Sequence, residues 1–186
     1  MPRGRGRPSY LPPVENPAGT YYEADSINFL IENRLSVGNN EAQVRQTWLN
    51  ILAHNFPPVD GYMIAAEADA GSGRLDVQVS EVVYQGRRDE SIFFVVECKN
   101  PRYEGAIESW EDAVEQLFGY LAAVARRERL RPGGRKWGAV SIGKSVQFWK
   151  YVEGELSLRP LHSNALRLDR QYQSVQQWLD YIKERS

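Results

Sequence analysis

Hydrophobic and polar residues alternate with two different periods along the chain, and each period predicts a type of element. In four segments the apolar residues recur every three or four positions, which is the spacing of one face of an amphipathic helix. Asn40 followed three positions later by Gln43 is typical of a capping box, so we expect the second helix to begin there. The four expected helices cover residues 26–36, 40–54, 108–130 and 169–184.

Between and after these helices, shorter apolar and β-branched runs predict strands. Residues 74–80 alternate strictly, which places Leu75, Val77 and Val79 on one side of a strand. Residues 91–100 contain an almost continuous apolar run, which is typical of a strand buried on both faces. Further strands are expected at residues 61–67, 137–141, 145–152 and 155–159.

The order of these elements predicts the fold class. We expect an α/β (α+β) domain whose mixed central sheet is flanked by helices. The short loop at residues 85–90 favours antiparallel pairing of the strands on either side. The 186 residues suffice for one domain with a sizeable core. We therefore expect a folded domain over residues 21–186, after a flexible arm over residues 1–20 that is rich in Pro, Gly and Arg.

Composition narrows the class of protein. No apolar run reaches the ~18 residues of a membrane-spanning helix, and the first residues lack the apolar segment of a secretory signal. We therefore expect an intracellular protein without a membrane span. A single cysteine excludes an internal disulfide and a cysteine-based zinc site, and two histidines leave little room for histidine-centred chemistry.

Charge is distributed unevenly, although the net charge is only -1. Residues 1–10 carry +3, and residues 126–136, the basic segment, carry +5, which leaves -9 for the remainder. Basic patches on an acidic body predict local contact with a polyanion. A charge run is also explained as a solvated face. The candidate phosphate contacts of the basic segment are Arg127, Arg131, Arg135 and Lys136.

Two charged residues end the apolar run of residues 91–100. Glu97 and Lys99 are two positions apart, so in a strand they share a side while Cys98 points away. Charged side chains are rarely buried without a partner. This pattern predicts either an ion pair or an active site.

Two more carboxylates are candidates for the same place. Asp76 lies near the start of the preceding strand, and in an antiparallel pair it would adjoin Glu97. Glu41 lies in the first turn of the second helix, where interaction with the helix dipole also explains it. Neighbouring carboxylates repel unless a cation neutralises them, and oxygen ligands favour Mg2+ or Mn2+. Such a cation would bind a phosphate oxygen and activate water, with Lys99 orienting or deprotonating that water or offsetting charge.

These residues resemble a known nuclease pattern. Asp76, followed 21 positions later by Glu97-Cys98-Lys99, resembles the Asp…Glu-x-Lys motif of the PD-(D/E)XK nuclease superfamily. Gln116-Leu-Phe-Gly-Tyr120 is similar to the Gln-x-x-x-Tyr helix motif of its RecB-like branch, which also occurs in type I restriction subunits. The resemblance covers roughly residues 40–121, and Leu75 stands where the family has its leading proline.

The resemblance implies a restriction-endonuclease-like core and metal-dependent phosphodiester hydrolysis, with DNA as the usual substrate and Mg2+ (or Mn2+) as the cofactor. It implies metal ligation by Asp76 and Glu97, catalytic assistance by Lys99 and a supporting metal-side carboxylate at Glu41. Gln116 and Tyr120 would hold the site or contact the DNA backbone, although Tyr120 is equally explained as a packed residue. A homodimer that cuts both strands is compatible with so small a domain.

The N-terminal arm carries a second resemblance. Arg5-Gly6-Arg7-Pro8, preceded by Arg3, resembles an AT-hook, in which glycine lets the backbone lie in a narrow minor groove beside the arginines. A solvated basic tail or a localisation signal explains the same residues. An AT-hook favours a nuclear protein, and without it a bacterial cytoplasm fits equally well. A non-catalytic DNA-binding or interaction module on the nuclease fold is the main alternative, and a nuclease for RNA or branched DNA is another.

Overall fold

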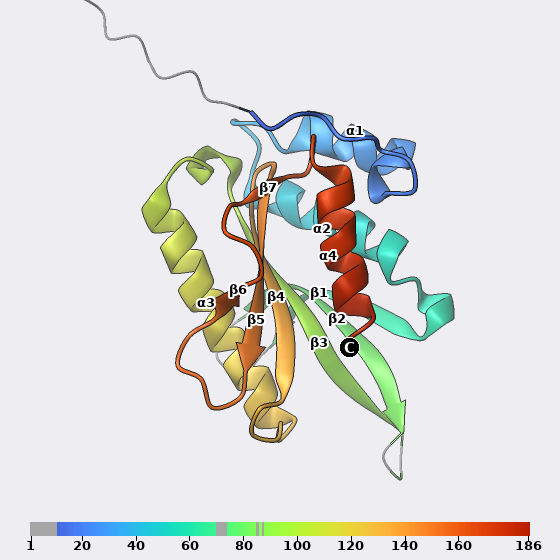
Figure 1. Ribbon diagram of the computed structural model, residues 1–186, viewed down its shortest axis with the longest axis vertical. Coiled ribbons are helices and arrows are strands. Elements are labelled where there is room, and N and C mark those ends of the chain that lie inside the picture. Colours follow the sequence, from blue (N-terminus) through green and yellow to red (C-terminus); the bar gives the residue numbers. More distant parts are fainter. Residues whose placement is uncertain (1–10, 70–73, 85, 87) are drawn as a thin grey trace, which may run out of the picture.

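The computed structural model describes residues 11–69, 74–84, 86 and 88–186. Within these ranges, seven strands form one sheet in the order β1-β2-β3-β4-β5-β6, with β7 paired to β5 (Figure 1). Only β3 and β4 are parallel among these pairs. The predicted mixed α+β class is therefore confirmed. The strands are β1 (Tyr62–Asp69), β2 (Arg74–Tyr84), β3 (Arg88–Lys99), β4 (Arg135–Ile142), β5 (Ser145–Val152), β6 (Arg159–Pro160) and β7 (Leu166–Arg167).

Helices cover both faces of the sheet. In Figure 1, α3 lies on one face, and α1, α2 and α4 lie on the other. Asn40 caps α2 with both hydrogen bonds of the predicted capping box, which confirms the start of that helix. The helices are α1 (Asp25–Arg34), α2 (Glu41–Asn55), α3 (Ile107–Arg127) and α4 (Tyr172–Lys183), with 3-10 turns η1 (Tyr21–Glu23), η2 (Pro58–Asp60) and η3 (Pro101–Tyr103).

Two hydrophobic cores hold these layers together, and β3 contributes to both. Val95 packs with Leu117 of α3, whereas Phe94 and Val96 pack with Trp48 of α2 on the opposite face. All of these side chains are essentially buried. Residues 92–98 are buried without interruption, which confirms the strand predicted to be covered on both faces.

The parallel pairing of β3 with β4 determines where the ends of α3 lie. Parallel neighbours need a crossover connection, and α3 supplies it. The helix therefore begins beyond η3, just after Lys99 at the end of β3, and returns along the sheet. At its far end Glu128 accepts a hydrogen bond from the backbone N–H of Ile92, near the start of β3. The two ends of α3 thus lie at opposite ends of β3.

Two expected element boundaries are wrong. A strand over residues 155–159 is not formed, because the pairing of this segment with β5 is confined to Arg159 and Pro160. The third helix ends at Arg127 instead of continuing to 130. Arg129, which follows it, has a left-handed φ of 54°, a conformation that stops a helix.

The strict alternation predicted for residues 74–80 also fails at its start. Val77 and Val79 pack on the α2 side, but Leu75 packs on the α3 side. The register of β1 with β2 runs from Ala66↔Val77 to Ala68↔Leu75, with Glu67 between them. Glu67 has a φ of 51°, so the regular pleat is interrupted at this point.

The prediction that residues 11–20 belong to a flexible arm is wrong. The backbone N–H of Glu15 donates to the carbonyl of Arg170 at 2.7 Å. The Glu15 carboxylate accepts hydrogen bonds from the backbone N–H (3.0 Å) and Oγ (2.5 Å) of Ser174 in α4. Residues 11–20 therefore belong to the folded domain, while the AT-hook-like residues Arg3, Arg5 and Arg7 lie outside the described ranges. No helix in those ranges is both long enough and apolar enough to cross a bilayer.

Candidate active site

The antiparallel pairing of β2 with β3 brings the two predicted strand carboxylates together. The register places Val77 opposite Val96, so Asp76 and Glu97 are next in line on neighbouring strands. Asp76 Oδ2 accepts a hydrogen bond from the backbone N–H of Cys98 at 2.8 Å. Asp76 is 9% exposed and Glu97 only 2%. Two acidic residues therefore lie almost buried at the end of β3.

The two oxygens of Glu97 differ in their surroundings. Oε1 accepts a hydrogen bond from Lys99 Nζ at 2.6 Å, as expected for residues that share one side of a strand. Oε2 is buried and has no hydrogen-bond partner among the residues that the structure describes. Burial and then the nearby Asp76 raise the pKa of Glu97 to about 7, although Lys99 acts in the opposite direction. A buried carboxylate oxygen without a partner is costly, and a bound cation would satisfy it.

Lys99 joins this strand pair to α3. Its Nζ also donates to Gln116 Oε1 at 2.7 Å. Burial alone would lower the pKa of Lys99, but its hydrogen bond to Glu97 and the surrounding carboxylates outweigh burial and raise that pKa. Lys99 is therefore an ammonium ion at neutral pH, held by a carboxylate on one side and an amide on the other.

Glu41 and Tyr120 lie close enough to Asp76, Glu97 and Lys99 for these charges to affect their pKa values. Burial and then Asp76 raise the pKa of Glu41, which begins α2 directly after its Asn40 cap. Tyr120 is half-buried on α3, and burial followed by Glu97 raises the pKa of its hydroxyl. Asp76, Glu97, Lys99 and Gln116 are thus linked by hydrogen bonds or neighbouring strand positions, and Glu41 and Tyr120 lie within electrostatic range of them. We call the six residues predicted for this place the Glu97 site: Glu41, Asp76, Glu97, Lys99, Gln116 and Tyr120.

Sequence reasoning missed one residue of this neighbourhood. Arg45 of α2 donates from Nη1 to Asp76 Oδ1 at 2.9 Å and pairs through Nη2 with Glu67 Oε1 at 3.0 Å. Arg45 follows Glu41 by four positions, so both lie on one side of the helix. That spacing was a usable signal, because a helix that presents Glu41 to the site also presents Arg45.

The Glu97 site offers few ligands to a divalent cation. Within the described part of the chain, no three His, Cys, Asp or Glu side chains are gathered as a ready-made metal site. Glu41 is therefore not part of a preformed three-carboxylate cluster with Asp76 and Glu97. Mg2+ is commonly held by only one or two carboxylates together with water and substrate phosphates. The unpartnered oxygen of Glu97 beside Asp76 fits that mode of binding.

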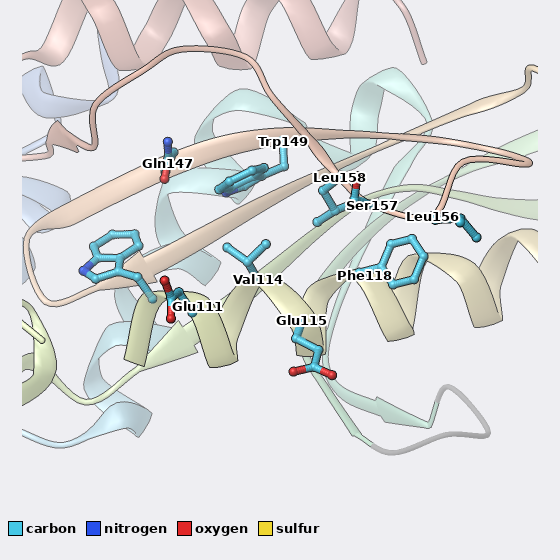
Figure 2. Close-up of a pocket in the computed structure, with 10 residues that line it drawn as sticks. Glu111, Val114, Glu115, Phe118, Gln147, Trp149, Leu156, Ser157 and Leu158 are labelled. Atoms are coloured by element: carbon cyan, nitrogen blue, oxygen red, sulfur yellow. The ribbon is translucent and has the colours of Figure 1, made fainter. Parts of the chain in front are cut away.

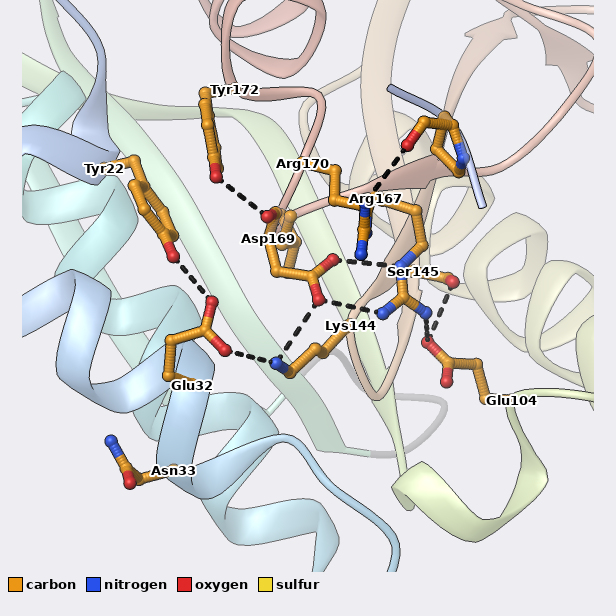
Figure 3. Close-up of polar contacts among 12 residues, drawn as sticks. Tyr22, Glu32, Asn33, Glu104, Lys144, Ser145, Arg167, Asp169, Arg170 and Tyr172 are labelled. Carbon is orange, nitrogen blue, oxygen red and sulfur yellow. Dashed lines mark hydrogen bonds and ion pairs between the residues drawn. The ribbon is translucent and has the colours of Figure 1, made fainter. Parts of the chain in front are cut away.

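A network of polar side chains holds the loop that follows Lys99 (Figure 3). Glu104, which directly follows η3, accepts hydrogen bonds through Oε1 from Ser145 Oγ at 2.8 Å and Arg167 Nη1 at 3.0 Å. These partners come from the start of β5 and from β7. The loop leaving the Glu97 site is thus anchored to the far strands of the sheet.

The same network reaches the N-terminal helices. Arg167 also pairs with Asp169 through two hydrogen bonds of 3.0 Å. Lys144, in the turn between β4 and β5, lies 3.3 Å from Asp169 and 2.7 Å from Glu32 of α1 (Figure 3). Four segments distant in sequence are therefore fixed to one another behind the site.

The basic segment lies at the other end of α3, away from the Glu97 site. Arg127, Arg131 and Arg135 are exposed there. Lys136 is different, because it is 4% exposed and its Nζ pairs with Glu128 at 2.5 Å. The prediction of Lys136 as a phosphate contact is therefore wrong for this structure. Ser91, which contacts this pair, precedes Glu97 by six residues in β3. At about 3.3 Å per residue, the Lys136–Glu128 pair therefore lies roughly 20 Å from the Glu97 site.

A hollow of about 570 Å³ lies between α3 and β5 (Figure 2). Aromatic side chains of Trp110, Phe118 and Trp149 line it together with Glu111 and Glu115. None of the six residues of the Glu97 site lines this hollow. It is therefore separate from the predicted chemistry.

No family model, no curated protein and no solved structure matches this chain. Its function must therefore be argued from the geometry of the Glu97 site.

Proposed function

We propose that this protein is a divalent-metal-dependent nuclease that hydrolyses phosphodiester bonds, most simply as a DNA endonuclease. One observation carries the proposal: one oxygen of buried Glu97 accepts a hydrogen bond from Lys99, and the other, beside Asp76, has no partner in the described part of the chain. An ion pair built only for stability would satisfy both oxygens. The resemblance of these residues to the Asp…Glu-x-Lys motif supports the same conclusion.

In this proposal Asp76 and Glu97 would hold Mg2+ or Mn2+. The bound ion would polarise a phosphate oxygen and lower the pKa of a coordinated water. Lys99 remains protonated, so its role is to offset negative charge that develops on the phosphate instead of removing a proton. Gln116 holds the Lys99 ammonium in place through its side-chain oxygen. Glu41 adds negative charge near the ion, and Tyr120 borders the site.

DNA is the proposed partner because exposed arginines lie at the end of α3 opposite to the Glu97 site, where a long polyanion that occupies the site would reach them. Arg127, Arg131 and Arg135 are available for phosphate oxygens, which they would bind without reading sequence. Arg3, Arg5 and Arg7 are proposed as additional contacts in a minor groove. Cutting both strands of a duplex from one site per chain would call for a homodimer, which sedimentation with and without DNA would test.

The test is cleavage of supercoiled and linear DNA in Mg2+, Mn2+ or EDTA. Asp76→Asn keeps the shape of the side chain but removes its charge and one of the two acceptor oxygens that Arg45 and Cys98 use, and Lys99→Met keeps the length of the side chain. Each variant should lower cleavage by about a hundredfold or more. Lys183→Met is the matched control. Lys183, the last residue of α4, pairs with Asp60 of η2 and takes no part in the Glu97 site. Cleavage that persists in EDTA or in both site variants would contradict the proposal.

One observation favours the alternative of a non-catalytic DNA-binding module. Both oxygens of Asp76 are already engaged, one by Arg45 and the other by the backbone N–H of Cys98. Under this alternative the wild type would not cut, and it would bind DNA equally well with Asp76→Asn and Lys99→Met. Binding would then weaken only when the exposed arginines are replaced.

A further inference from the structure

Arg45 places a permanent positive charge against one of the proposed metal ligands. Its guanidinium lies between two carboxylates, 2.9 Å from Asp76 and 3.0 Å from Glu67. The side chains of Arg45 and Asp76 are 20% and 12% exposed, so solvent screens this pair only weakly. A planar guanidinium can hold two carboxylates at once and remains charged at any physiological pH.

The backbone fixes this arrangement from two directions. Arg45 stands one helical turn after Glu41, in a helix whose start is capped by Asn40. Glu67 meets it from β1 through the left-handed conformation at φ 51°, an uncommon state for a residue other than glycine. A strained backbone that delivers a carboxylate to Arg45 indicates that the position of this guanidinium is specified by the fold.

The charge balance shows what the guanidinium does. Four carboxylates, those of Glu41, Glu67, Asp76 and Glu97, lie around the two cations Arg45 and Lys99. Arg45 lies directly against Asp76 and Glu67, so it offsets negative charge at the place where a divalent ion would bind. Removing the guanidinium would leave Asp76 without this counter-charge and make the site more attractive to a cation.

We propose that Arg45 is a resident counter-cation of Asp76. It stabilises the site when no metal is bound, and it weakens the binding of the divalent ion that the proposed function requires. This inference rests on the proposed function. Arg45 is a positioning residue in this scheme, because it acts on the metal and the substrate through Asp76.

A weakened metal site has a consequence for the order of binding. Arg45 offsets part of the negative charge of the carboxylates. A phosphate of the nucleic acid would supply negative charge to the bound metal in its place. Metal and polyanion would therefore bind more tightly together than either does alone, since each neutralises charge introduced by the other.

The experiment compares Arg45→Met with wild type in thermal unfolding and in Mn2+ binding followed by electron paramagnetic resonance, without DNA. We expect Arg45→Met to unfold at a lower temperature in EDTA, because Asp76 loses its counter-charge. We also expect it to bind Mn2+ about tenfold more tightly and to gain more thermal stability from Mn2+ than wild type. Arg45→Lys, which keeps the charge but not the planar guanidinium, should bind Mn2+ as weakly as wild type. Arg102→Met removes an equal charge from an exposed arginine that packs on Tyr103, and should change neither measurement.

The outcomes separate the two proposals. Mn2+ binding by wild type that is unchanged or weaker in Arg45→Met would overturn the inference and leave the metal site standing. Absence of Mn2+ binding in both proteins at millimolar concentrations would overturn the proposed function, and the inference with it. If Arg45→Met does not fold in EDTA, Arg45→Gln keeps hydrogen-bond donors without the charge and decides the question by the same two measurements.

Discussion

A largely buried lysine–carboxylate pair lies near each end of β3, and the two pairs are built differently. Near its start, Glu128 accepts from Ile92 N–H through Oε1 at 2.8 Å, and from Lys136 and Ser91 Oγ through Oε2 at 2.5 and 3.2 Å. At its end, Glu97 accepts from Lys99 through Oε1 at 2.6 Å, while no described residue is a partner of Oε2. Both oxygens of Glu128 are hydrogen-bonded, so we call the Lys136–Glu128 pair the closed pair. We call the Lys99–Glu97 pair the open pair, because one oxygen of Glu97 remains available to a ligand.

The comparison separates stability from function. A buried pair whose oxygens are all hydrogen-bonded offsets the cost of removing its charges from water. A pair with one unsatisfied oxygen does so incompletely, and the raised pKa of Glu97 is the sign of that imbalance. Buried charge alone is thus weak evidence for a functional site, whereas buried charge without its full set of partners is stronger evidence.

The largest effect should come from breaking the closed pair. Lys136→Met leaves the Glu128 carboxylate half-buried without its cation, so we expect the free energy of unfolding to fall by about 3 kcal/mol. Urea unfolding at neutral pH measures this loss. Binding of Mn2+ by the folded protein should not change, because the pair lies at the other end of β3.

A second substitution controls for the packing of the Lys136 side chain. Glu128→Gln added to Lys136→Met removes the uncompensated charge while it keeps an acceptor for Ile92 N–H. The double variant should recover part of the lost stability. A double variant as unstable as Lys136→Met would show that packing, and not charge, explains the loss.

A smaller effect of opposite sign is expected at the open pair. The pKa of Glu97 is about 7 in the folded chain against 4.5 ordinarily, so the folded chain holds a proton that the unfolded chain has lost. Its contribution to stability is therefore full below about pH 4.5 and is lost as the pH rises toward 7. Relative to wild type in EDTA, Glu97→Gln should gain up to about 3 kcal/mol between about pH 5 and about pH 8.

Urea unfolding of both proteins across this pH range is the measurement. Other titrating groups contribute equally to wild type and variant, so the difference between the two isolates Glu97. A difference that stays constant with pH would mean that Glu97 is not the group that titrates. In Mn2+ the pH dependence of wild type should flatten, because a bound cation stabilises the charged carboxylate.

The smallest effect on stability should come from Gln116. Its side chain is exposed and contributes one hydrogen bond to Lys99, so Gln116→Ala should change the free energy of unfolding by only about 0.5 kcal/mol. Cleavage should fall by about tenfold, since Lys99 loses the group that orients it. Gln177→Ala, at an exposed position of α4, is the matched control and should leave cleavage unchanged. Equal cleavage by both variants would remove Gln116 from the site.

Local patterns in the sequence predicted the features that depend on neighbouring residues. The capping box at Asn40, the buried strand through Phe94 and the meeting of Asp76 with Glu97 followed from periodicity and antiparallel pairing. The fold class followed from the order of elements. The resemblance then selected Gln116, whose contact with Lys99 is present in the structure.

Features that depend on distant partners were not predictable. The basic run indicated exposure for Lys136, but Ser91, which is 45 positions away, helps to bury it. Glu15 belongs to the fold because it contacts Ser174, 159 positions further along the chain. Arg45 is an intermediate case, because its helical side was predictable and its pairing with Glu67 was not.

The crossover helix α3 also has a consequence for how far the protein would reach along DNA. Gln116 contacts Lys99, and Arg127 lies eleven residues further along the same rigid helix, a distance of roughly 16 Å at about 1.5 Å per residue. Successive nucleotides of one strand rise about 3.4 Å along the axis of the duplex, so this length corresponds to roughly five nucleotides along that axis. Each protomer of the proposed nuclease would therefore protect DNA to one side of its own cut, over a length that α3 sets.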